Sequence, residues 1–581
     1  SATMPCGPRE VDLCGQIMED HFGITVARVG MLVLREKLAL PSIIMALCRT
    51  GEKKEQLPVD TVRRALSILE QHNLLLISLD ASFRTFYRLD PQAVQDMMVF
   101  SRVCLVAKTL YGTAAEAICM ELASKGRLSC SETLRRARCY LTHGASEIKE
   151  RFSWLAEAQF IVRCAPMETK VRGAPTYAMV YEKYAMPDEI ALIPEPTGNE
   201  KPQQPQPVEE PKVELDVKPD LAQLKAFRKR KTPMGEEEKK ANGTPDPDRD
   251  ILWKLNITRF RRYVRDEIVL DMVCGSMETG HSEETSSSTA TSSSTAARYA
   301  MRALLKVVEI RVPHVDAVCT PPVTFVDILR AAKDGGFPVE KKELEWALTL
   351  IVDESRGIVR RAGDSGGGLY VLDFERAVAL AVDVHVDAMI REQIDGKAVR
   401  IRRLLRNTGY LEEETIEKTV MIPAKTTRDL LYSMLEENYI CIKSIGKTGD
   451  FAPARTICLY YVDQQQTVRT LVESTCMMLR NLIIRRLRLE KDSKYLLMQQ
   501  MKMENIISVI DQDPNLDEAT KRTQREEVQE IYMSEANKEA LVVFEQQHNL
   551  LNSSEIEVEK ALFAMRMYLR HANKRIGTLS G

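Results

Sequence analysis

The sequence predicts a mainly α-helical fold with small β-hairpins, built from four similar modules in tandem and a C-terminal helical hairpin. Three observations support this prediction. Residues 398–462 show three short helical patterns followed by two apolar strands, the helix-to-strand junction of this stretch recurs at three other places, and an apolar heptad pattern follows the last copy.

Residues 398–462 are the clearest copy of the module. A first helix is expected around Arg402, a second from Glu412 to Val420, and a third from Ala424 to Asn438, where apolar residues recur at helical spacing. Two apolar strands follow at 440–445 and 457–461, with a turn between them. Three helices and a hairpin are the pattern of a winged helix, which is a helix-turn-helix with a two-stranded wing beside its last helix.

The junction between the third helix and the first strand repeats along the chain. It reads SILEQHNLLLI from Ser67, SWLAEAQFIVR from Ser153, SMLEENYICIK from Ser433 and, more loosely, TLIVDESRGIVRR from Thr349. Generic helix-to-strand junctions would share some of this pattern. Four copies at the spacing of a small domain favour four tandem, extended winged-helix domains.

Domain boundaries follow from these repeats and from shifts in composition. The expected segments are winged helix 1 at 8–90, winged helix 2 at 91–185, a disordered Pro/Glu/Lys-rich linker at 186–249, winged helix 3 at 250–373 with a flexible Ser/Thr insertion at 280–296, winged helix 4 at 374–463, and a coiled-coil helical hairpin at 464–576. In the second domain, one long helix is expected from Pro91 to about Leu122. Its wing is expected to pair residues 160–163 with residues 176–181, and the wing of the third domain to pair residues 358–361 with residues 369–372.

The linker almost lacks aromatic residues, so it cannot bury enough apolar area to offset its chain entropy. It contains a basic cluster from Lys225 to Lys231. Such a cluster fits a nuclear localisation signal or a backbone-binding patch, and it fits a solvated charge run equally well.

The C-terminal stretch carries an apolar residue every seven positions, which is typical of a coiled-coil seam. The residues of the seam are Leu482, Leu489, Leu496, Met503 and Ile510. A break is expected at residues 511–516, and a return helix from about Glu518 to Asn573 with a second break near 549–554. The prediction is an antiparallel helical hairpin whose seam docks partner proteins.

The totals exclude several classes of protein. The net charge is −2 over 581 residues, so any nucleic-acid surface must be local. No apolar run is long enough to span a bilayer. The 13 cysteines contain no C-x-x-C and the 8 histidines no H-E-x-x-H, which argues against a disulfide framework and a zinc ion. No cofactor is expected.

Two apparent catalytic motifs fail on context. Residues 363–368 read GDSGGG, as around a serine-protease nucleophile, but no histidine base precedes them in a suitable segment, and the glycines fit the turn of a wing. Residues 446–448 read GKT, yet the phosphate loop needs a glycine at position 441, which is Cys441, and a helix after the motif. A non-enzymatic function is favoured.

Several stretches resemble one known family. They are Glu19–Gly23, Leu66–Asn73, Thr109–Tyr111, Gly363–Tyr370, Met421–Lys425 and Ala452–Thr456. With the order of modules, linker and coiled coil, these stretches resemble the third-largest subunit of RNA polymerase III, which is related to the alpha subunit of the initiation factor TFIIE. The Ser/Thr tract departs from that family by its length.

The resemblance implies a non-catalytic subunit of the nuclear polymerase that makes transfer RNA, 5S ribosomal RNA and other small RNAs. Its implied partners are the polymerase clamp, a TFIIE-beta-like winged-helix subunit, a small subunit with an acidic tail, the initiation factor TFIIIB and promoter DNA. The implied role is to support initiation and promoter opening.

Basic residues on the expected third helices and wings are the candidate phosphate contacts. They are Arg63, Arg64 and Arg84 in the first domain and Lys425, Arg428 and Lys447 in the fourth. Solvated faces, or faces docked on other subunits, are the alternative for each residue. The rival to a scaffold is a free-standing tandem winged-helix regulator of transcription, which would need a strong basic excess on its recognition helices.

Overall fold

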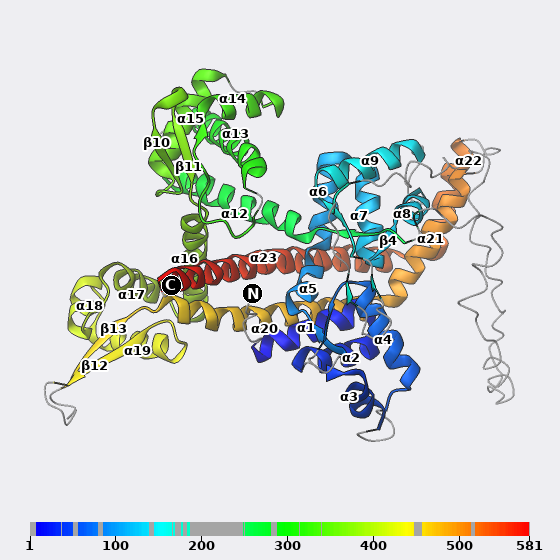
Figure 1. Cartoon of the computed structure of the whole chain (residues 1–581), viewed down its shortest axis with the longest axis horizontal. Coiled ribbons are helices and arrows are strands. Elements are labelled where there is room, and N and C mark those ends of the chain that lie inside the picture. The colour runs from blue at the N-terminus through cyan, green and yellow to red at the C-terminus, as the bar shows by residue number, and fades with distance from the viewer. Residues whose placement is uncertain are drawn as a thin grey trace. The chain divides into compact units, whose positions relative to one another are not determined.

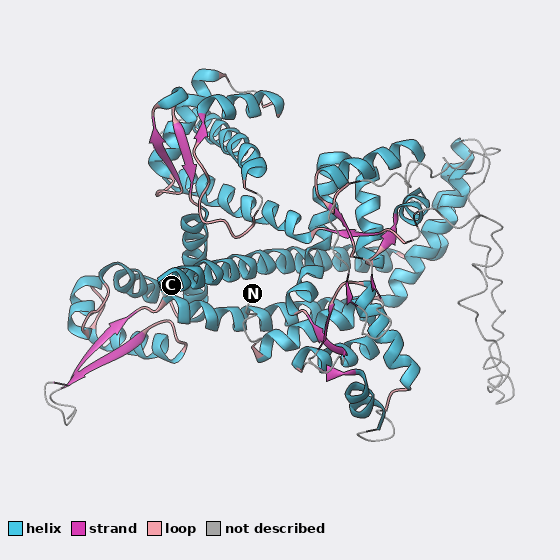
Figure 2. Cartoon of the chain, in the orientation of Figure 1, coloured by secondary structure: helices cyan, strands magenta, loops and turns pink. Residues whose placement is uncertain are grey.

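The structure is a computed structural model that describes residues 7–36, 38–49, 56–79, 85–138, 145–165, 167–168, 176–177, 183–185, 248, 250–280, 287–312, 314–337, 340–446, 456–512 and 518–579. The fold is mainly helical, with small antiparallel sheets (Figure 2). The chain divides into two compact units, Glu36–Phe260 and a second unit made of Ser1–Arg35 with Arg261–Gly581. Apart from Asp248, the predicted linker and its basic cluster lie outside the described residues.

The unit Glu36–Phe260 contains two helical modules, each with a small sheet. The elements of the first are β1 (Leu38–Ala39), α3 (Leu40–Ile44), α4 (Val59–Gln71), β2 (Leu75–Leu79) and β3 (Thr85–Leu89). The elements of the second are α5 (Pro91–Asp96), α6 (Phe100–Tyr111), α7 (Thr113–Lys125), β4 (Leu128–Ser129), α8 (Cys130–Ala137), α9 (Ala145–Glu157), β5 (Ile161–Arg163), β6 (Met167–Glu168), β7 (Thr176–Tyr177) and β8 (Leu252–Leu255).

Three predictions for these modules were wrong. The helix expected from Pro91 to Leu122 is broken, because Gly112 adopts a φ of 85°, which ends α6 and lets α7 begin. The first module was expected to begin at residue 8, but α1 and α2 belong to the other unit.

The third error concerns the wing of the second module. β5 does not pair with residues 176–181; it pairs with β8, which lies beyond the linker, and β4 pairs with the other edge of β8. Trp253 of β8 is fully buried, with its ring edge-on to Phe152 at 5.5 Å between centroids. The second module therefore includes residues 252–255, which were assigned to the third. A pairing across so long a segment leaves no short-range signal.

The other unit contains the remaining modules and the C-terminal helices. Its helices are α1 (Pro8–Phe22), α2 (Ile24–Arg35), α12 (Ile257–Gly280), α13 (Ser287–Arg311), α14 (Phe325–Asp334), α15 (Lys341–Glu354), α16 (Phe374–Gln393), α17 (Gly396–Thr408), α18 (Glu413–Val420), α19 (Ala424–Glu436), α20 (Gln464–Asp492), α21 (Lys494–Gln512), α22 (Glu518–Tyr532) and α23 (Glu535–Leu579). Its strands are β9 (Val323–Thr324), β10 (Val359–Gly363), β11 (Leu369–Leu372), β12 (Cys441–Gly446) and β13 (Thr456–Tyr461). Helix α13 begins at Ser287, so the second half of the tract predicted as a flexible insertion is helical.

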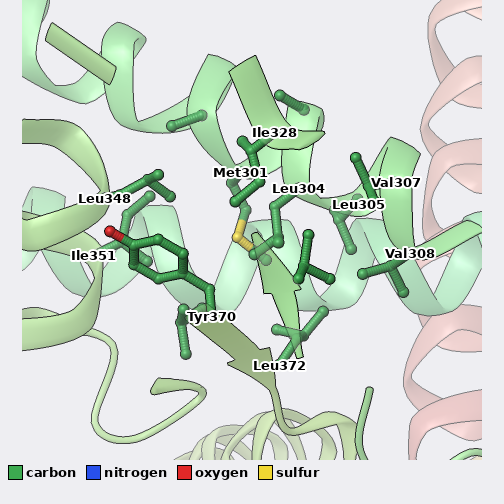
Figure 3. Packing of buried hydrophobic residues seen from close by; sticks show 14 of the residues in the cluster. Met301, Leu304, Leu305, Val307, Val308, Ile328, Leu348, Ile351, Tyr370 and Leu372 are labelled. Atoms are coloured by element: carbon green, nitrogen blue, oxygen red, sulfur yellow. The ribbon is translucent and has the colours of Figure 1, made fainter. Parts of the chain in front are cut away.

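A close-packed apolar core holds the third module together (Figure 3). Leu304 of α13, Ile328 of α14, Ile351 of α15 and Leu372 of β11 are each fully buried in it. Because these residues come from three helices and a wing strand, the core fixes the hairpin β10–β11 beside the helices. The wings predicted at 358–361 with 369–372, and at 440–445 with 457–461, are confirmed by strand pairing.

Four of the five sheets among the described residues share one arrangement. In each, the residues just before the penultimate helix of the module, which is α3, α8, α14 or α18, pair with the second wing strand. The pairs are β1 with β3, β4 with β8, β9 with β11, and Leu411 with Tyr460 as an isolated bridge. The first wing strand, β2, β5, β10 or β12, is then the edge of the sheet among the described residues.

The repeated junction also has a physical cause. Two residues beyond α4, α9, α15 and α19 stand Asn73, Gln159, Arg356 and Asn438, all with positive φ. After three of these helices the next backbone N–H donates to a carbonyl five residues back, at Leu69, Leu155 and Met434. This is the left-handed C-cap that closes a helix and redirects the chain into a strand. These hydrogen bonds make Met434 the structural equivalent of Leu69 and Leu155. Aligning the three sequences on their serines would instead place Leu435 there, one residue later.

Helices α20 and α23 run side by side and carry the rest of their unit (Figure 1). α1 packs on α20, and α16 packs on α23. Of the break predicted at 511–516, residues 511–512 still belong to α21, which ends at Gln512, and residues 513–516 lie outside the described residues. The second break was predicted in the wrong place. It falls at residues 533–534, and α23 continues through 549–554, where the hydroxyls of Ser553 and Ser554 donate to the Leu550 carbonyl.

Candidate nucleic-acid and partner interface

Arg63 and Arg64 lie on the outer face of α4, as predicted. The side chain of Arg63 is 63% exposed, and its one ion pair among the described residues is a long one with Asp60, at 3.8 Å. Arg63 also lines a surface cavity of about 230 Å³ whose other walls are mainly apolar, among them Leu66 and Ile77. Arg64 is exposed and makes no ion pair with any described residue. Arg64 is therefore available to a phosphate, whereas Arg63 stands at an apolar cavity.

On α19, Lys425 is available to a phosphate, whereas Arg428 is paired with a carboxylate. Lys425 is exposed in the first turn, and among the described residues it has no ion-pair partner. Arg428 donates from Nε to Oε1 of Glu413 on α18 at 2.9 Å, and this hydrogen bond raises the pKa of its guanidinium. The charge of Arg428 is thus shared with the chain's own carboxylate. Arg84 and Lys447, the candidates on the wings, lie outside the described residues.

The seam residues lie on two successive helices. Leu482 and Leu489 belong to α20, while Leu496, Met503 and Ile510 belong to α21, because the chain turns at Ser493. All five are half-buried. α21 packs against α22 and α23, so the chain's own helices cover part of this seam. Its role in docking partners stays a prediction.

Sequence reasoning missed a set of basic residues that bind the chain to itself. They form ion pairs between α20 or α23 and the elements that pack on them. The pairs are Arg261–Glu559 (2.6 Å), Lys560–Glu267 (3.0 Å), Lys560–Asp271 (2.5 Å), Arg570–Asp316 (3.0 Å), Arg575–Glu375 (2.7 Å), Arg566–Glu10 (2.8 Å) and Arg486–Asp20 (2.7 Å). We call these the spine pairs. The only sequence signal was that arginines interrupt apolar helical faces.

Arg486 is the centre of one such node. It donates to Asp20 of α1 and to Glu555 of α23, at 2.7 and 2.9 Å. Burial opposes its charged form, but these hydrogen bonds outweigh burial and raise the pKa of the guanidinium. Lys560 behaves alike, since hydrogen bonds to Asp271 and Glu267 outweigh its burial and raise its pKa. Both residues are positive at every physiological pH.

Arg402 is the centre of a second node, which fastens α17 to α16 and α20. Its side chain is 2% exposed. It bonds to Asp383 at 2.7 Å, to Asp387, and to the amide oxygen of Gln464 at 3.0 Å. The sequence-based expectation placed Arg402 in the first helix of the fourth module, without assigning it this contact. A buried arginine with two carboxylates fixes the direction in which that module leaves the helical pair.

The GDSGGG segment forms the tip of the third module's wing. Gly366, Gly367 and Gly368 have φ values of 64°, 87° and 123°, which a side chain rarely adopts, so the turn requires the glycines. Ser365 is exposed in this turn between β10 and β11. A short one-turn connection explains the motif without a nucleophile.

Two further searches concern the described residues alone. No group of three or more His, Cys, Asp or Glu side chains among them could hold a metal ion. None of their helices is both long and apolar enough to cross a membrane.

Comparison with known proteins points to one family. Residues 150–380 match the family described as RNA polymerase III subunit RPC82, and residues 386–462 match the family described as POLR3C, C-terminal winged-helix domain. The second match coincides with α17–α19 and the hairpin β12–β13.

Curated relatives match over almost the whole chain. The DNA-directed RNA polymerase III subunit RPC3 of Mus musculus is 28% identical over 97% of this chain and 99% of the mouse protein. The subunits of the same name from Homo sapiens and Danio rerio are 28% and 27% identical, again over 97% of this chain and over 99% and 98% of their own lengths. The chain therefore belongs to the family of the third-largest subunit of RNA polymerase III, named RPC82 or RPC3 in its members.

Proposed function

We propose that this chain is a non-catalytic RNA polymerase III subunit that acts as the scaffold of a peripheral heterotrimer on the polymerase clamp. In this role it supports initiation and promoter opening at genes for transfer RNA, 5S ribosomal RNA and other small RNAs in the nucleus. Its proposed partners are the clamp, a TFIIE-beta-like winged-helix subunit, an acidic-tailed small subunit, TFIIIB and promoter DNA.

The observation that carries the scaffold proposal is the set of spine pairs. Their side chains join α1, α12 and α16 to the same two helices, and Arg402 joins the fourth module to them. A chain built to turn over a substrate concentrates perturbed acids and bases in a cleft. Here the buried charges are spread along a helical pair, where each holds a separate element in place.

The shared third strand and the shared left-handed cap support a finer proposal about architecture. Each of the four modules presents a helix-turn-helix and a wing with the same pairing order. We take them to be four winged-helix domains, and α20–α23 to be a coiled-coil support for those in their unit. Such domains offer third helices and wings to nucleic acid or protein.

The first test is affinity purification of the tagged full chain from nuclear extract at moderate salt, with mass spectrometry of the recovered proteins. The expected result is a near-stoichiometric multi-subunit RNA polymerase. A charge-reversed Arg486→Glu chain should recover less polymerase, because α1 is released from α20. Recovery of the chain alone would contradict the scaffold role.

A second test concerns DNA. Binding of the full chain to a DNA duplex with an unpaired bubble should weaken with salt, and each phosphate contact removed should lower the slope of log K against log salt by about 0.7–0.9. We expect this change for Arg64→Ala and Lys425→Ala. Arg428→Ala is the matched control, because Glu413 already holds its charge. Equal effects from all three would show that only overall charge matters.

The alternative function is a free-standing, sequence-specific regulator built from tandem winged helices. It predicts tight binding of the pure chain to one duplex sequence over others. The exposed side chains of α19 do not favour it, because Lys425 and Arg428 share that face with Asp429 and Glu436.

A further inference from the structure

The wing of the fourth module has an open edge. β12 spans six residues, Cys441–Gly446, and pairs in unbroken register with β13 on one side, from Cys441 opposite Tyr461 to Gly446 opposite Thr456. On its other side β12 has no strand partner among the described residues.

The hydrogen bonds on the far side of β13 show in which direction the backbone groups of β12 point. Tyr460 exchanges both of its backbone hydrogen bonds with Leu411, at 2.8 and 3.1 Å. Its N–H and C=O therefore point away from β12, and Ile442, which lies opposite Tyr460, is not bonded to it. By alternation, Cys441, Lys443 and Ile445 bond to β13. The N–H and C=O groups of Ile442 and Ser444 then point away from β13, at the open edge of the sheet.

This edge lacks the features that usually block strand addition. β10, the corresponding edge of the third module, is interrupted by a bulge between Arg361 and Gly363. β5, in the second module, is only three residues long. β12 has no proline and no bulge, and its one charge is Lys443. Its middle residues are exposed, Ile442 by 36% and Ile445 by 47%. An exposed edge strand of six residues without a bulge or a proline is a template for another strand.

The side chains on β12 specify what such a strand would carry. Cys441, Lys443 and Ile445 share one face of the hairpin, since side chains alternate along a strand. The ammonium of Lys443 lies 5.6 Å from the ring centroid of Tyr410, which is itself 52% exposed. Residues directly opposite one another across a new pair of strands would meet on that face. An acidic residue is favoured opposite Lys443, with apolar residues two positions to either side of it.

We infer that β12 is a docking edge for an extended segment of a partner protein, with the pattern apolar–x–acidic–x–apolar. Main-chain bonds to Ile442 and Ser444 supply the attachment, and Lys443 selects the sequence. The chain already uses this chemistry internally, because β8 completes the sheet of the second module from beyond the linker. A second copy of the chain fits less well, since antiparallel pairing of two β12 strands centred on Lys443 would place the two lysines opposite each other.

The inference deepens the scaffold proposal by naming one partner's chemistry, and it is tested on the pure full chain without polymerase. The probe is a fluorescein-labelled, end-capped peptide TVTETVT, compared with TVTKTVT, and binding is read by anisotropy. Ser444→Pro removes an outward N–H without removing a bond to β13, so it should weaken binding of TVTETVT by about tenfold or more, equivalent to ~1.4 kcal/mol. Ser444→Thr is the matched control, because it keeps the N–H and should bind normally.

Charge reversal gives an independent readout. Lys443→Glu should lose affinity for TVTETVT and gain it for TVTKTVT, while circular dichroism and melting stay as in the unchanged chain. The inference is overturned if neither peptide binds at millimolar concentration, if Ser444→Pro binds as well as Ser444→Thr, or if both peptides bind equally. It is also overturned if light scattering shows a dimer that Ser444→Pro dissociates, since the occupant would then be a second copy. Loss of polymerase recovery with intact peptide binding would count against the scaffold proposal alone.

Discussion

The Arg402 node predicts a large local loss of stability. Arg402→Met keeps the length of the side chain but removes the charge that lies between Asp383 and Asp387. Breaking a buried ion pair costs about 3–5 kcal/mol. We expect the lower figure, about 3 kcal/mol, because Asp387 keeps Arg403 at 2.7 Å and Asp383 keeps the Gln464 amide at 3.0 Å.

Hydrogen exchange of the backbone amides in α17 measures this loss, because a chain of several modules does not unfold in one step. A decrease of about 3 kcal/mol in the free energy of local opening lowers exchange protection by roughly a hundredfold. Arg403→Met is the control, since its side chain bonds the same carboxylate but is 63% exposed, and it should cost at most about 1 kcal/mol. Equal protection in the two variants would refute the conclusion that Arg402 holds α17 against α16 and α20.

The remaining predictions concern the sheet of the second module, its junction with the first, and a buried histidine. After a protease cut between residues 186 and 247, Trp253→Ala, which removes a fully buried ring at a cost of about 3–5 kcal/mol, should lower the hydrogen-exchange protection of β5, although the two fragments stay associated because α1 packs on α20. Gly126→Ala should weaken exchange protection at the end of α4, because the φ of Gly126 is 81° and an added Cβ would lie 2.4 Å from the carbonyl oxygen of Gln71. Gly112→Ala is the control, because Gly112 has a similar φ but open space around it. It should show only the cost of backbone strain, about 1–3 kcal/mol. Burial lowers the pKa of His571, so the unfolded chain takes up its proton first, and stability should fall as pH drops below about 6.5, by at most ~1.4 kcal/mol per pH unit. His571→Phe should flatten that slope in melting curves, and an unchanged slope would show that His571 is not its source.

Local patterns predicted the helices, the wings of the third and fourth modules and the repeated junction well. The reason is visible at Asn73 and Asn438, where the left-handed cap needs only a few residues in sequence. A run of apolar residues and the polar cap after it are local signals, and the chain's modules are built from them.

Long-range pairing could not be predicted in that way. Nothing near Ile161 shows that its partner is Leu255, because the pairing is decided by the burial of Trp253 in a core formed elsewhere. The break after α22 was misplaced for a related reason. Polar residues at 549–554 suggested an end, but their hydroxyls bond within α23, whereas Ser534 caps the helix that begins at Glu535.

The candidate site was predicted in outline only. Positions on third helices correctly located Arg64 and Lys425 on exposed faces, since helical period decides which side of a helix is buried. The pairing of Arg428 with Glu413 and the burial of Arg402 and Arg261 depend on other elements. A local pattern does not show whether a charged residue faces solvent or a carboxylate on a distant element, so no pattern indicated the spine pairs.

The strand β8 also makes residues 164–251 a closed loop, because β5 and β8 lie side by side in one sheet. The entropy of closing a flexible loop rises only with the logarithm of its length, and each doubling adds about 0.6 kcal/mol. A longer connection between β5 and β8 therefore costs the second module little, whereas the sheet that closes it, with Trp253 at its centre, is held to close packing.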